Sequence, residues 1–393
     1  MTTILQIVPQ MKPGGVEFYT LRMVDAVVKA GGRALVASAP GELVSEIDAL
    51  GGEHVHVSAD AKNWLRWPGI ARQLSDLIAR EAVDLVHVGS RGPGWLALLA
   101  RRHRAFPLVM NYHGAYSTGF PGKTLYNRVM TRGDVCLASS RFTAQIVREQ
   151  HGLADDKLVR IWLGIDPADF DPADIDDTRR RALLDTWGIR DGQRIVLSAG
   201  RLVSLKGHDV VIRAADHVLR AHDDAVFVIA GDDSGRDQYR TKLEEMAAAS
   251  YDPSRVRLVG HCADMAAAFA TAHVSVIGSI RPETFSYVAV ESQAMGCPVI
   301  SADAGAVGDT IETDDEAGRT GWLYPPGDAD AMAKRINAAL TMSPEDRAAM
   351  GARCRSRTLD LFTLERMQRE TLAQYDRLLG TQLAARFSDR HHA

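Results

Sequence analysis

Hydrophobic and polar positions divide the first half of the chain into two alternating kinds of segment. Short apolar, β-branched runs predict buried strands, and longer stretches with apolar residues three and four positions apart predict amphipathic helices. The predicted strands are Thr3–Val8, Ala34–Ala39, Glu53–Val57, Leu85–Val88, Leu108–Tyr112, Val135–Ala138 and Leu158–Trp162. The predicted helices are Val16–Ala30, Gly41–Leu50, Pro68–Glu81, Gly94–His103, Lys123–Met130 and Ser140–His151. This alternation predicts βαβ units around a parallel sheet that is covered on both faces.

The second half of the chain repeats the alternation. Its predicted strands are Arg194–Ala199, Ala225–Ala230, Val256–Val259, Val274–Ile277, Pro298–Ser301 and Gly321–Tyr324. Its predicted helices are His208–Ala221, Gln238–Ala248, Ala263–Ala270, Ser286–Met295 and Ala329–Leu340. We therefore expect an α/β protein with two Rossmann-like domains that face each other across a cleft.

The predicted domains cover residues 1–165 and 190–360, and a linker rich in proline and aspartate at 166–189 joins them. A C-terminal helix over 361–393 is expected to return towards the first domain. Open α/β sheets bind ligands beyond the carboxyl ends of their strands. The residues that follow the strands are therefore the candidates for function.

Composition and charge narrow the classes of protein. The 393 residues are 46% hydrophobic and 24% charged, which is typical of a globular chain and excludes a disordered or fibrous one. The net charge of −4 disfavours a nucleic-acid binder. The four cysteines lie too far apart for a disulfide framework or a zinc site. With neither a signal peptide nor an apolar run of ~18 residues, we predict a cytoplasmic protein.

The segment Arg281–Ile300 carries two carboxylates, Glu283 and Glu291, around a predicted helix start. Unpaired backbone N–H groups and the positive end of the helix dipole make such a position suitable for an anion. If the segment were wholly helical, the two carboxylates would lie roughly 12 Å apart. The alternative is that Glu291 is a solvated helix residue and Glu283 is only a cap.

Cations follow the strand that ends at Ala199. Arg201 and Lys206 lie in a glycine-bounded loop, where they could neutralise a diphosphate, although two exposed loop cations are the alternative. In the first half, the glycine loop Pro13–Glu17 could admit a phosphate, or it could be a tight turn. His113 closes a predicted strand and is a candidate for catalysis or for a structural role.

Together, these segments resemble the family-four retaining glycosyltransferases, which have the two-Rossmann GT-B fold. The similar phrases occur in the family's order across most of the chain. They are Gly14–Glu17, Tyr112–Gly114, Gly164–Asp166, Gly200–Arg201, Lys206–Gly207, Val228–Asp232 and the Glu-x7-Glu pair Glu283 and Glu291 with its following Ala294–Ile300. Within the family, the chain resembles the enzymes of bacterial envelope and lipopolysaccharide glycans.

The resemblance implies a role for each candidate. The implied catalytic residues are His113 beside the anomeric centre, Glu283 on the donor-sugar hydroxyls, and Arg201 and Lys206 on the diphosphate. The implied donor-binding residues are Gly15, Arg201, Lys206, Leu258, Val259, Glu283, Thr284, Phe285, Ser286 and Glu291. Of these, Glu291 would bind the ribose, and a loop at Leu258–Gly260 would present main-chain groups to the nucleobase. The family uses no metal and no cofactor, and we favour UDP over GDP in the donor.

Some positions depart from the family pattern. Ser286 stands where glycine is usual, Tyr287 stands where an aliphatic residue is common, and Gly305–Asp309 differs from the usual Gly-Gly-x-x-Glu. We expect none of these positions to touch the phosphate clamp formed by Arg201 and Lys206.

The resemblance implies a retaining, metal-independent hexosyltransferase that moves a sugar from a nucleotide diphosphate sugar to a glycan or glycolipid in cell-envelope polysaccharide synthesis. The alternatives are a nucleotide-sugar 2-epimerase of the same fold and a transferase that acts on a soluble small acceptor. An NAD-dependent oxidoreductase is disfavoured because no Gly-x-Gly-x-x-Gly is present. A periplasmic sugar-binding protein would need a signal peptide.

The acceptor side is predicted from aromatic and basic residues of the first domain. Lys62–Pro68 places two tryptophans among cations, and Arg101–Arg104 adds a basic cluster. Residues 101–150 contain eight basic and two acidic side chains. Such groups suit an anionic membrane surface, so we predict peripheral contact with the inner membrane. A tryptophan packed on a helix and a solvated basic face are the alternative.

Overall fold

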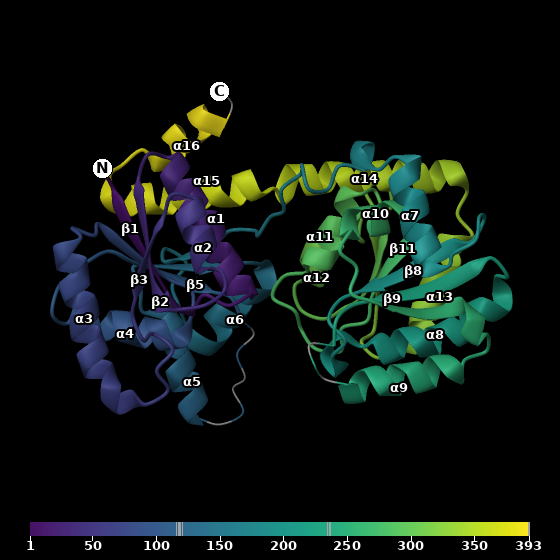
Figure 1. The fold of residues 1–393 in the computed structure, drawn as a ribbon, viewed down its shortest axis with the longest axis horizontal. Helices are drawn as coiled ribbons and strands as arrows, with labels where there is room; N and C mark the ends of the chain where they lie inside the picture. Colours follow the sequence, from purple (N-terminus) through teal and green to yellow (C-terminus); the bar gives the residue numbers. More distant parts are fainter. Residues whose placement is uncertain (115, 117–118, 120, 234, 236, 392–393) are drawn as a thin grey trace. The chain divides into compact units, whose positions relative to one another are not determined.

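The computed structural model describes the whole chain except residues 115, 117, 118, 120, 234, 236, 392 and 393. The chain forms two compact units (Figure 1). Unit 1 contains residues 1–163 and 364–393, and unit 2 contains residues 164–363. Each unit has its own sheet, so the expected two Rossmann-like domains are confirmed.

Unit 1 is built on a seven-stranded parallel sheet with the strand order β3-β2-β1-β4-β5-β6-β7. Its strands are β1 (Thr3–Gln10), β2 (Arg33–Ala39), β3 (Glu53–His56), β4 (Leu85–Val88), β5 (Leu108–Tyr112), β6 (Val135–Ala138) and β7 (Leu158–Arg160). Its helices are α1 (Gly15–Lys29), α2 (Val44–Ala49), α3 (Trp67–Arg80), α4 (Arg91–Arg101), α5 (Pro121–Asn127), α6 (Arg141–His151), α15 (Leu364–Leu379) and α16 (Leu383–His391).

The two faces of the unit 1 sheet are covered by different helices, because successive side chains of a strand point to opposite faces. Leu5 and Ile7 belong to the apolar cluster that α3 and α4 share with the sheet. Gln6, between them, donates to the carbonyl oxygen of Thr20 on α1 at 3.1 Å. Helices α1, α15 and α16 pack together (Figure 1). The C-terminal segment is thus part of unit 1.

Unit 2 repeats the architecture with six parallel strands in the order β10-β9-β8-β11-β12-β13. The strands are β8 (Arg194–Ala199), β9 (Ala225–Ala230), β10 (Val256–Gly260), β11 (Val274–Ile277), β12 (Val299–Ala302) and β13 (Gly321–Tyr324). The helices are α7 (Asp177–Trp187), α8 (His208–Ala221), α9 (Asp237–Ala248), α10 (Met265–Thr271), α11 (Tyr287–Ala294), α12 (Val307–Thr310), α13 (Ala329–Leu340) and α14 (Pro344–Leu361).

Two segments differ from the sequence prediction. Residues 166–189, treated as a linker, contain α7 and bury Trp187 in the core of unit 2. The sequence of this helix is mostly polar or charged and has few apolar residues, so its hydrophobic pattern did not predict a helix. Its ends do carry helix signals, because Asp176 caps it and Gly188 ends it in the left-handed conformation. The predicted single helix over 361–393 is two helices. Asp376 accepts hydrogen bonds from the first amides of α16, which fixes the break.

No helix within the described part of the chain combines the length and the apolar character needed to cross a membrane.

Candidate functional site

The strand order of unit 2 brings the predicted cations and the first predicted carboxylate to one edge of the sheet. Strands β8 and β11 are hydrogen-bonded neighbours and run parallel, so the loops after them lie side by side. Lys206 Nζ lies 2.8 Å from Glu283 Oε1, and Ser279 Oγ donates to the same oxygen. The Lys206 side chain is 26% exposed and that of Glu283 is 16% exposed. The sequence predicted the shared edge but missed both the direct pairing and Ser279.

Two glycines allow the loops after β8 and β11 to touch. Gly207 has a φ of +63°, and a β-carbon there would overlap the carbonyl oxygen of Gly278. A β-carbon on Gly278 would in turn lie 2.5 Å from the Gly207 oxygen. The amide of Ile280 donates to the Leu205 oxygen at 3.0 Å. This backbone contact sets where Lys206 lies relative to Glu283.

His208 holds the other end of the loop after β8. Its Nδ1 lies 3.1 Å from Ser198 Oγ, and its Nε2 lies 3.2 Å from the Arg201 carbonyl oxygen. Burial lowers the pKa of His208 to about 4, so the ring is neutral at physiological pH. The Arg201 side chain is exposed, and no ion pair to it is found among the described residues. A fixed backbone therefore carries a cation that can reach an anionic ligand.

The backbone of Glu283 is held by the segment Ala304–Ala306. Its amide donates to the Ala304 oxygen at 3.2 Å, and its carbonyl accepts from the Ala306 amide at 2.7 Å. Gly305, at φ +79°, leaves no room for a β-carbon beside Glu283. Gly305 thus lies against the backbone of Glu283, the ion-pair partner of Lys206, and the expectation that Gly305–Asp309 does not touch Arg201 or Lys206 themselves stays a prediction. Spacing along the chain does not reveal this long-range contact.

The second carboxylate lies on α11, whereas Glu283 precedes this helix. The distance of roughly 12 Å between the carboxylates of Glu283 and Glu291, which assumed that the whole segment is helical, therefore does not apply. Ser286 is the N-cap of α11 and accepts from the Ala289 amide at 3.4 Å, so it has a structural role at the position where the family usually has glycine. Phe285 is buried against Tyr287 and Phe362, which fixes the chain at the helix start, whereas Thr284 and Glu291 are partly exposed.

Leu258 and Val259 lie within β10, so the predicted loop at Leu258–Gly260 is the end of a strand. Strand β10 is the outermost strand on one side of the sheet, and the Gly260 carbonyl oxygen accepts a hydrogen bond from the Gly231 amide at 2.7 Å. Because the strands are parallel, β10 ends at the same carboxyl edge as the Lys206 loop, two strands away from β8. An edge strand retains main-chain groups that can bind a ligand.

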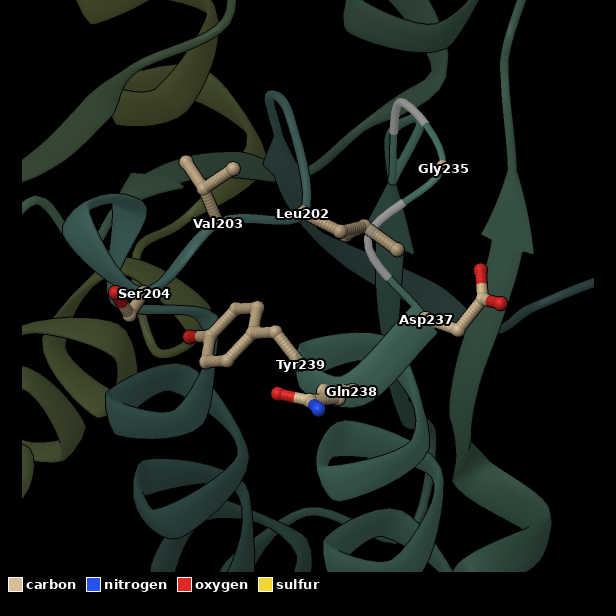
Figure 2. A pocket seen from close by; sticks show the side chains of 7 residues that line it. All are labelled: Leu202, Val203, Ser204, Gly235, Asp237, Gln238 and Tyr239. Atoms are coloured by element: carbon tan, nitrogen blue, oxygen red, sulfur yellow. The ribbon is translucent and has the colours of Figure 1, made fainter.

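A pocket of about 550 Å³ opens at the same edge of the unit 2 sheet. Figure 2 shows Tyr239, Gln238 and Asp237 from the first turn of α9 opposite Leu202 and Val203 from the loop after β8. Tyr239 donates to Asp209 Oδ1 at 2.9 Å and is thereby held in the wall. Lys206 and Glu283 are not among the described residues that line this pocket.

In unit 1, the predicted glycine loop leads into α1. Gly14 is extended, with φ −176°, and Gly15 is the exposed first residue of the helix. A β-carbon at Gly15 would meet nothing within 4 Å, whereas one on Gly14 would lie 2.5 Å from Glu17 Oε2. Within the first turn, burial raises the pKa of Glu17 above its usual value. A helix start suits an anion, and here the Glu17 carboxylate lies beside the glycine that precedes the helix.

His113 follows β5 directly, as predicted. Its ring centroid lies 5.0 Å from that of Tyr19 in an edge-on arrangement, and a β-carbon on Gly89 would lie 3.6 Å from its Nε2. Although the residue as a whole is partly exposed, burial of the ring lowers the pKa of His113 to about 4. The imidazole is therefore neutral at physiological pH and can act through a hydrogen bond rather than through a positive charge.

The aromatic and basic segments proposed for membrane contact lie at opposite edges of the unit 1 sheet. Trp64 follows β3 at the carboxyl edge and is 70% exposed, whereas Trp67 donates to the Ala61 oxygen and lines a pocket. Arg101 ends α4, close to the start of β5 at the amino edge, where it forms an ion pair with Asp134 at 2.6 Å. Lys62–Pro68 and Arg101–Arg104 therefore belong to the same unit but lie at opposite edges of its sheet, and the predicted membrane contact stays a prediction. Position in the sequence does not show to which edge a helix returns.

Comparison with known proteins gives a family for each half of the chain. Residues 13–169 match the family described as Glycosyltransferase Family 4, and residues 180–357 match the family described as Glycosyl transferases group 1. A D-inositol 3-phosphate glycosyltransferase of Catenulispora acidiphila is 30% identical over 65% of this chain, which spans 64% of that relative. A GDP-mannose-dependent phosphatidylinositol monomannoside mannosyltransferase of Corynebacterium glutamicum is 28% identical over 72% of this chain and 74% of its own length.

Solved structures support the same fold. A glycosyltransferase from Rickettsia africae has a TM-score of 0.89 at 27% identity, and the match covers 97% of this chain and 99% of the other. The Anabaena protein HepE, solved with UDP and glucose, has a TM-score of 0.78 at 18% identity over 96% of this chain and 100% of the other. The likeness to HepE concerns the fold alone.

Proposed function

Together, the family 4 match of the first half, the group 1 match of the second half and the GT-B fold show that this chain belongs to the family-four glycosyltransferases, and we propose that it is a retaining, metal-independent hexosyltransferase. The substrate would be a nucleotide diphosphate sugar, with UDP favoured over GDP as the nucleotide. The observation that carries this proposal is the cluster of Lys206, Glu283 and Ser279 beside the exposed Arg201 at the carboxyl edge of the unit 2 sheet.

The chemistry follows from where charge develops during transfer. As the bond between the sugar and the diphosphate breaks, the sugar becomes oxocarbenium-like and negative charge grows on the leaving phosphate. Arg201, Lys206 and the amides at the start of α11 would stabilise that charge most strongly where it is greatest, which lowers the barrier. The acceptor hydroxyl would attack from the side of the leaving group, and a leaving phosphate oxygen would take its proton. No carboxylate is assigned as a nucleophile.

The pairing of Lys206 with Glu283 supports a preorganised donor site. A carboxylate held by the lysine and by Ser279 keeps a fixed orientation, so Glu283 would accept hydrogen bonds from donor-sugar hydroxyls without first reorganising. Glu291 on α11 would contact the ribose, and Leu258, Val259 and Thr284 would complete the donor site. His113, neutral because of its buried ring, would act beside the anomeric centre.

The names of relatives and an exposed apolar patch support a glycan or glycolipid acceptor. One relative is named as a mannosyltransferase of phosphatidylinositol monomannoside, and its acceptor therefore carries a lipid. In unit 1, Trp64 and Leu65 are 70% and 67% exposed, and Lys62 and Arg66 flank them. Aromatic and cationic groups of this kind suit a membrane interface. We propose cell-envelope polysaccharide synthesis, of the lipopolysaccharide type, by a cytoplasmic enzyme that visits the inner membrane.

The test of activity is incubation of the full-length protein with a panel of UDP- and GDP-sugars, with and without sugar acceptors. We expect the sugar to be transferred with retention of the anomeric configuration, which NMR of the product measures. The rate should not change when EDTA or Mg²⁺ is added. Inversion or strict metal dependence would contradict the mechanism. Appearance of an epimerised sugar or its nucleotide would instead identify a 2-epimerase.

The test of membrane contact is co-sedimentation with vesicles containing anionic phospholipid. Binding should weaken with salt and in the double variant Trp64→Ser/Leu65→Ser. Arg102→Glu, an exposed change at the opposite edge of the sheet, is the matched control and should bind like the wild type. If the wild-type protein ignores these vesicles at low salt, a soluble acceptor is favoured.

A further inference from the structure

A buried polar cluster joins the C-terminal helix α15 to the neighbours of His113. His87 on β4 is 3% exposed, and its Nδ1 lies 2.6 Å from the hydroxyl of Tyr375, which is fully buried. The hydroxyl of Tyr19 on α1 lies 3.2 Å from Thr371 Oγ1. Thr371 and Tyr375 are one helical turn apart and therefore lie on one face of α15. Two side chains of the same helix thus hold two residues from different elements.

Of the two residues held by α15, Tyr19 contacts the His113 ring directly, and His87 belongs to the strand whose end lies against that ring. The Tyr19 ring packs edge-on against both histidines, with centroid distances of 5.0 Å to His113 and 5.8 Å to His87. Gly89, two residues beyond His87 on the same strand end, lies against the His113 ring. Edge-on ring contacts have a defined geometry, so fixing Tyr19 and the end of β4 also fixes the plane of the His113 ring.

Because the side chains of this cluster are buried, their hydrogen bonds favour a single position of α15 against unit 1. All four supporting side chains, Tyr19, His87, Thr371 and Tyr375, are less than 5% exposed. Leaving a buried hydroxyl or imidazole nitrogen without a hydrogen-bond partner costs free energy. A shift of α15 would break such bonds and would therefore destabilise the cluster. Helix α15 also docks independently, because Gln368 donates to the Arg22 carbonyl oxygen on α1 at 2.7 Å.

We propose that Tyr375 and Thr371 are positioning residues for His113, and that α15 is thereby a working part of the active site. This inference rests on the proposed function, in which His113 acts beside the anomeric centre. The residues that match the two family descriptions end at 357, so α15 lies outside both. A shift of about 1 Å at a reacting group can lower a rate by up to about 10²-fold, which is enough for a hydroxyl in α15 to matter.

The kinetic test is a double-mutant cycle on the full-length enzyme. Tyr375→Phe removes only the hydroxyl and should lower kcat by about 10-fold, with the donor KM unchanged because every predicted diphosphate and sugar contact except that of Gly15 lies in unit 2. In a His113→Ala background, Tyr375→Phe should cause no further loss, because Tyr375 acts through His113. Thr371→Val removes the partner of Tyr19 and should behave in the same way.

Gln368→Met is the matched control. It removes a bond between the same two helices but leaves the cluster intact, so its kcat should stay within about twofold of wild type. An equal loss from Tyr375→Phe with and without His113 would overturn the proposal. Unchanged kcat in both Tyr375→Phe and Thr371→Val would do so too.

A second measurement separates this inference from the proposed function. The imidazole NMR signals of His113 should move in Tyr375→Phe but not in Gln368→Met, whether or not sugar is transferred. Signals that stay in place would overturn the positioning role. Absence of any transfer by the wild-type protein, with the signals moving as expected, would overturn the proposed function and leave the coupling established.

Discussion

The contact between the backbone of Gly207 and that of Gly278 predicts that Gly207→Ala is among the most damaging single-methyl changes in unit 2. The new β-carbon would meet the Gly278 carbonyl oxygen, which is backbone and cannot rotate away. The residue also has a φ of +63°, which alanine adopts only with strain. To relieve the overlap, the loops after β8 and β11 would have to separate, and this would move Lys206 away from Glu283.

The magnitude has two parts. A left-handed conformation costs a non-glycine residue about 1–2 kcal/mol, and inserting a methyl group into a packed site costs about 1–3 kcal/mol more. We therefore expect Gly207→Ala to lower the free energy of unfolding of unit 2 by about 3 kcal/mol. Gly192→Ala isolates the first part, because Gly192 has a φ of +84° but a β-carbon there would meet nothing within 4 Å. This control should cost about 1 kcal/mol.

The assay is urea denaturation of the full-length protein, in which the unfolding of unit 2 is monitored by hydrogen exchange of its peptides. Turnover of the two variants is then compared under conditions where both are folded. Gly207→Ala should lose most of its activity, and Gly192→Ala should retain it. Equal losses of stability and activity in the two variants would refute the reasoning, since it would mean that the close approach of the loops contributes nothing.

Three other predictions concern charge and domain organisation. Lys206→Ala or Arg201→Ala should each lower kcat by roughly 10²-fold or more, as measured by steady-state kinetics, because each removes a charge-assisted contact to the leaving group. Burial lowers the pKa of both His208 and His273 to about 4, so the unfolded chain binds more protons between pH 6.5 and 4 and stability should fall as the pH falls through that window. Urea unfolding at pH 7 and pH 5 should show this loss, and His208→Gln should reduce it. Finally, calorimetry on residues 164–363 alone should detect UDP, and a folded fragment that fails to bind would place the donor contacts elsewhere.

Much of the fold was predictable because strands and helices have different hydrophobic periods. Each predicted strand is present, with ends that differ by about two residues at most. The predicted strands also indicated where the candidate residues lie. Parallel strands end at one edge of a sheet, so the carboxyl edge of unit 2 was the predicted place of Arg201, Lys206 and Glu283. Helix α7 was missed because its contacts to the core come from few residues, such as Trp187.

The sequence by itself determined which positions are buried, which residues follow the strands and, through its ordered motifs, the family. The tertiary structure decided which of those residues meet. It paired Lys206 with Glu283, placed Gly305 against the backbone of Glu283 and paired Arg101 with Asp134. It also brought Tyr375 to His87 across 288 positions of sequence. Periodicity encodes the face on which a side chain lies, whereas the order of strands and the path of a returning helix are set by packing between distant segments, which no local pattern records.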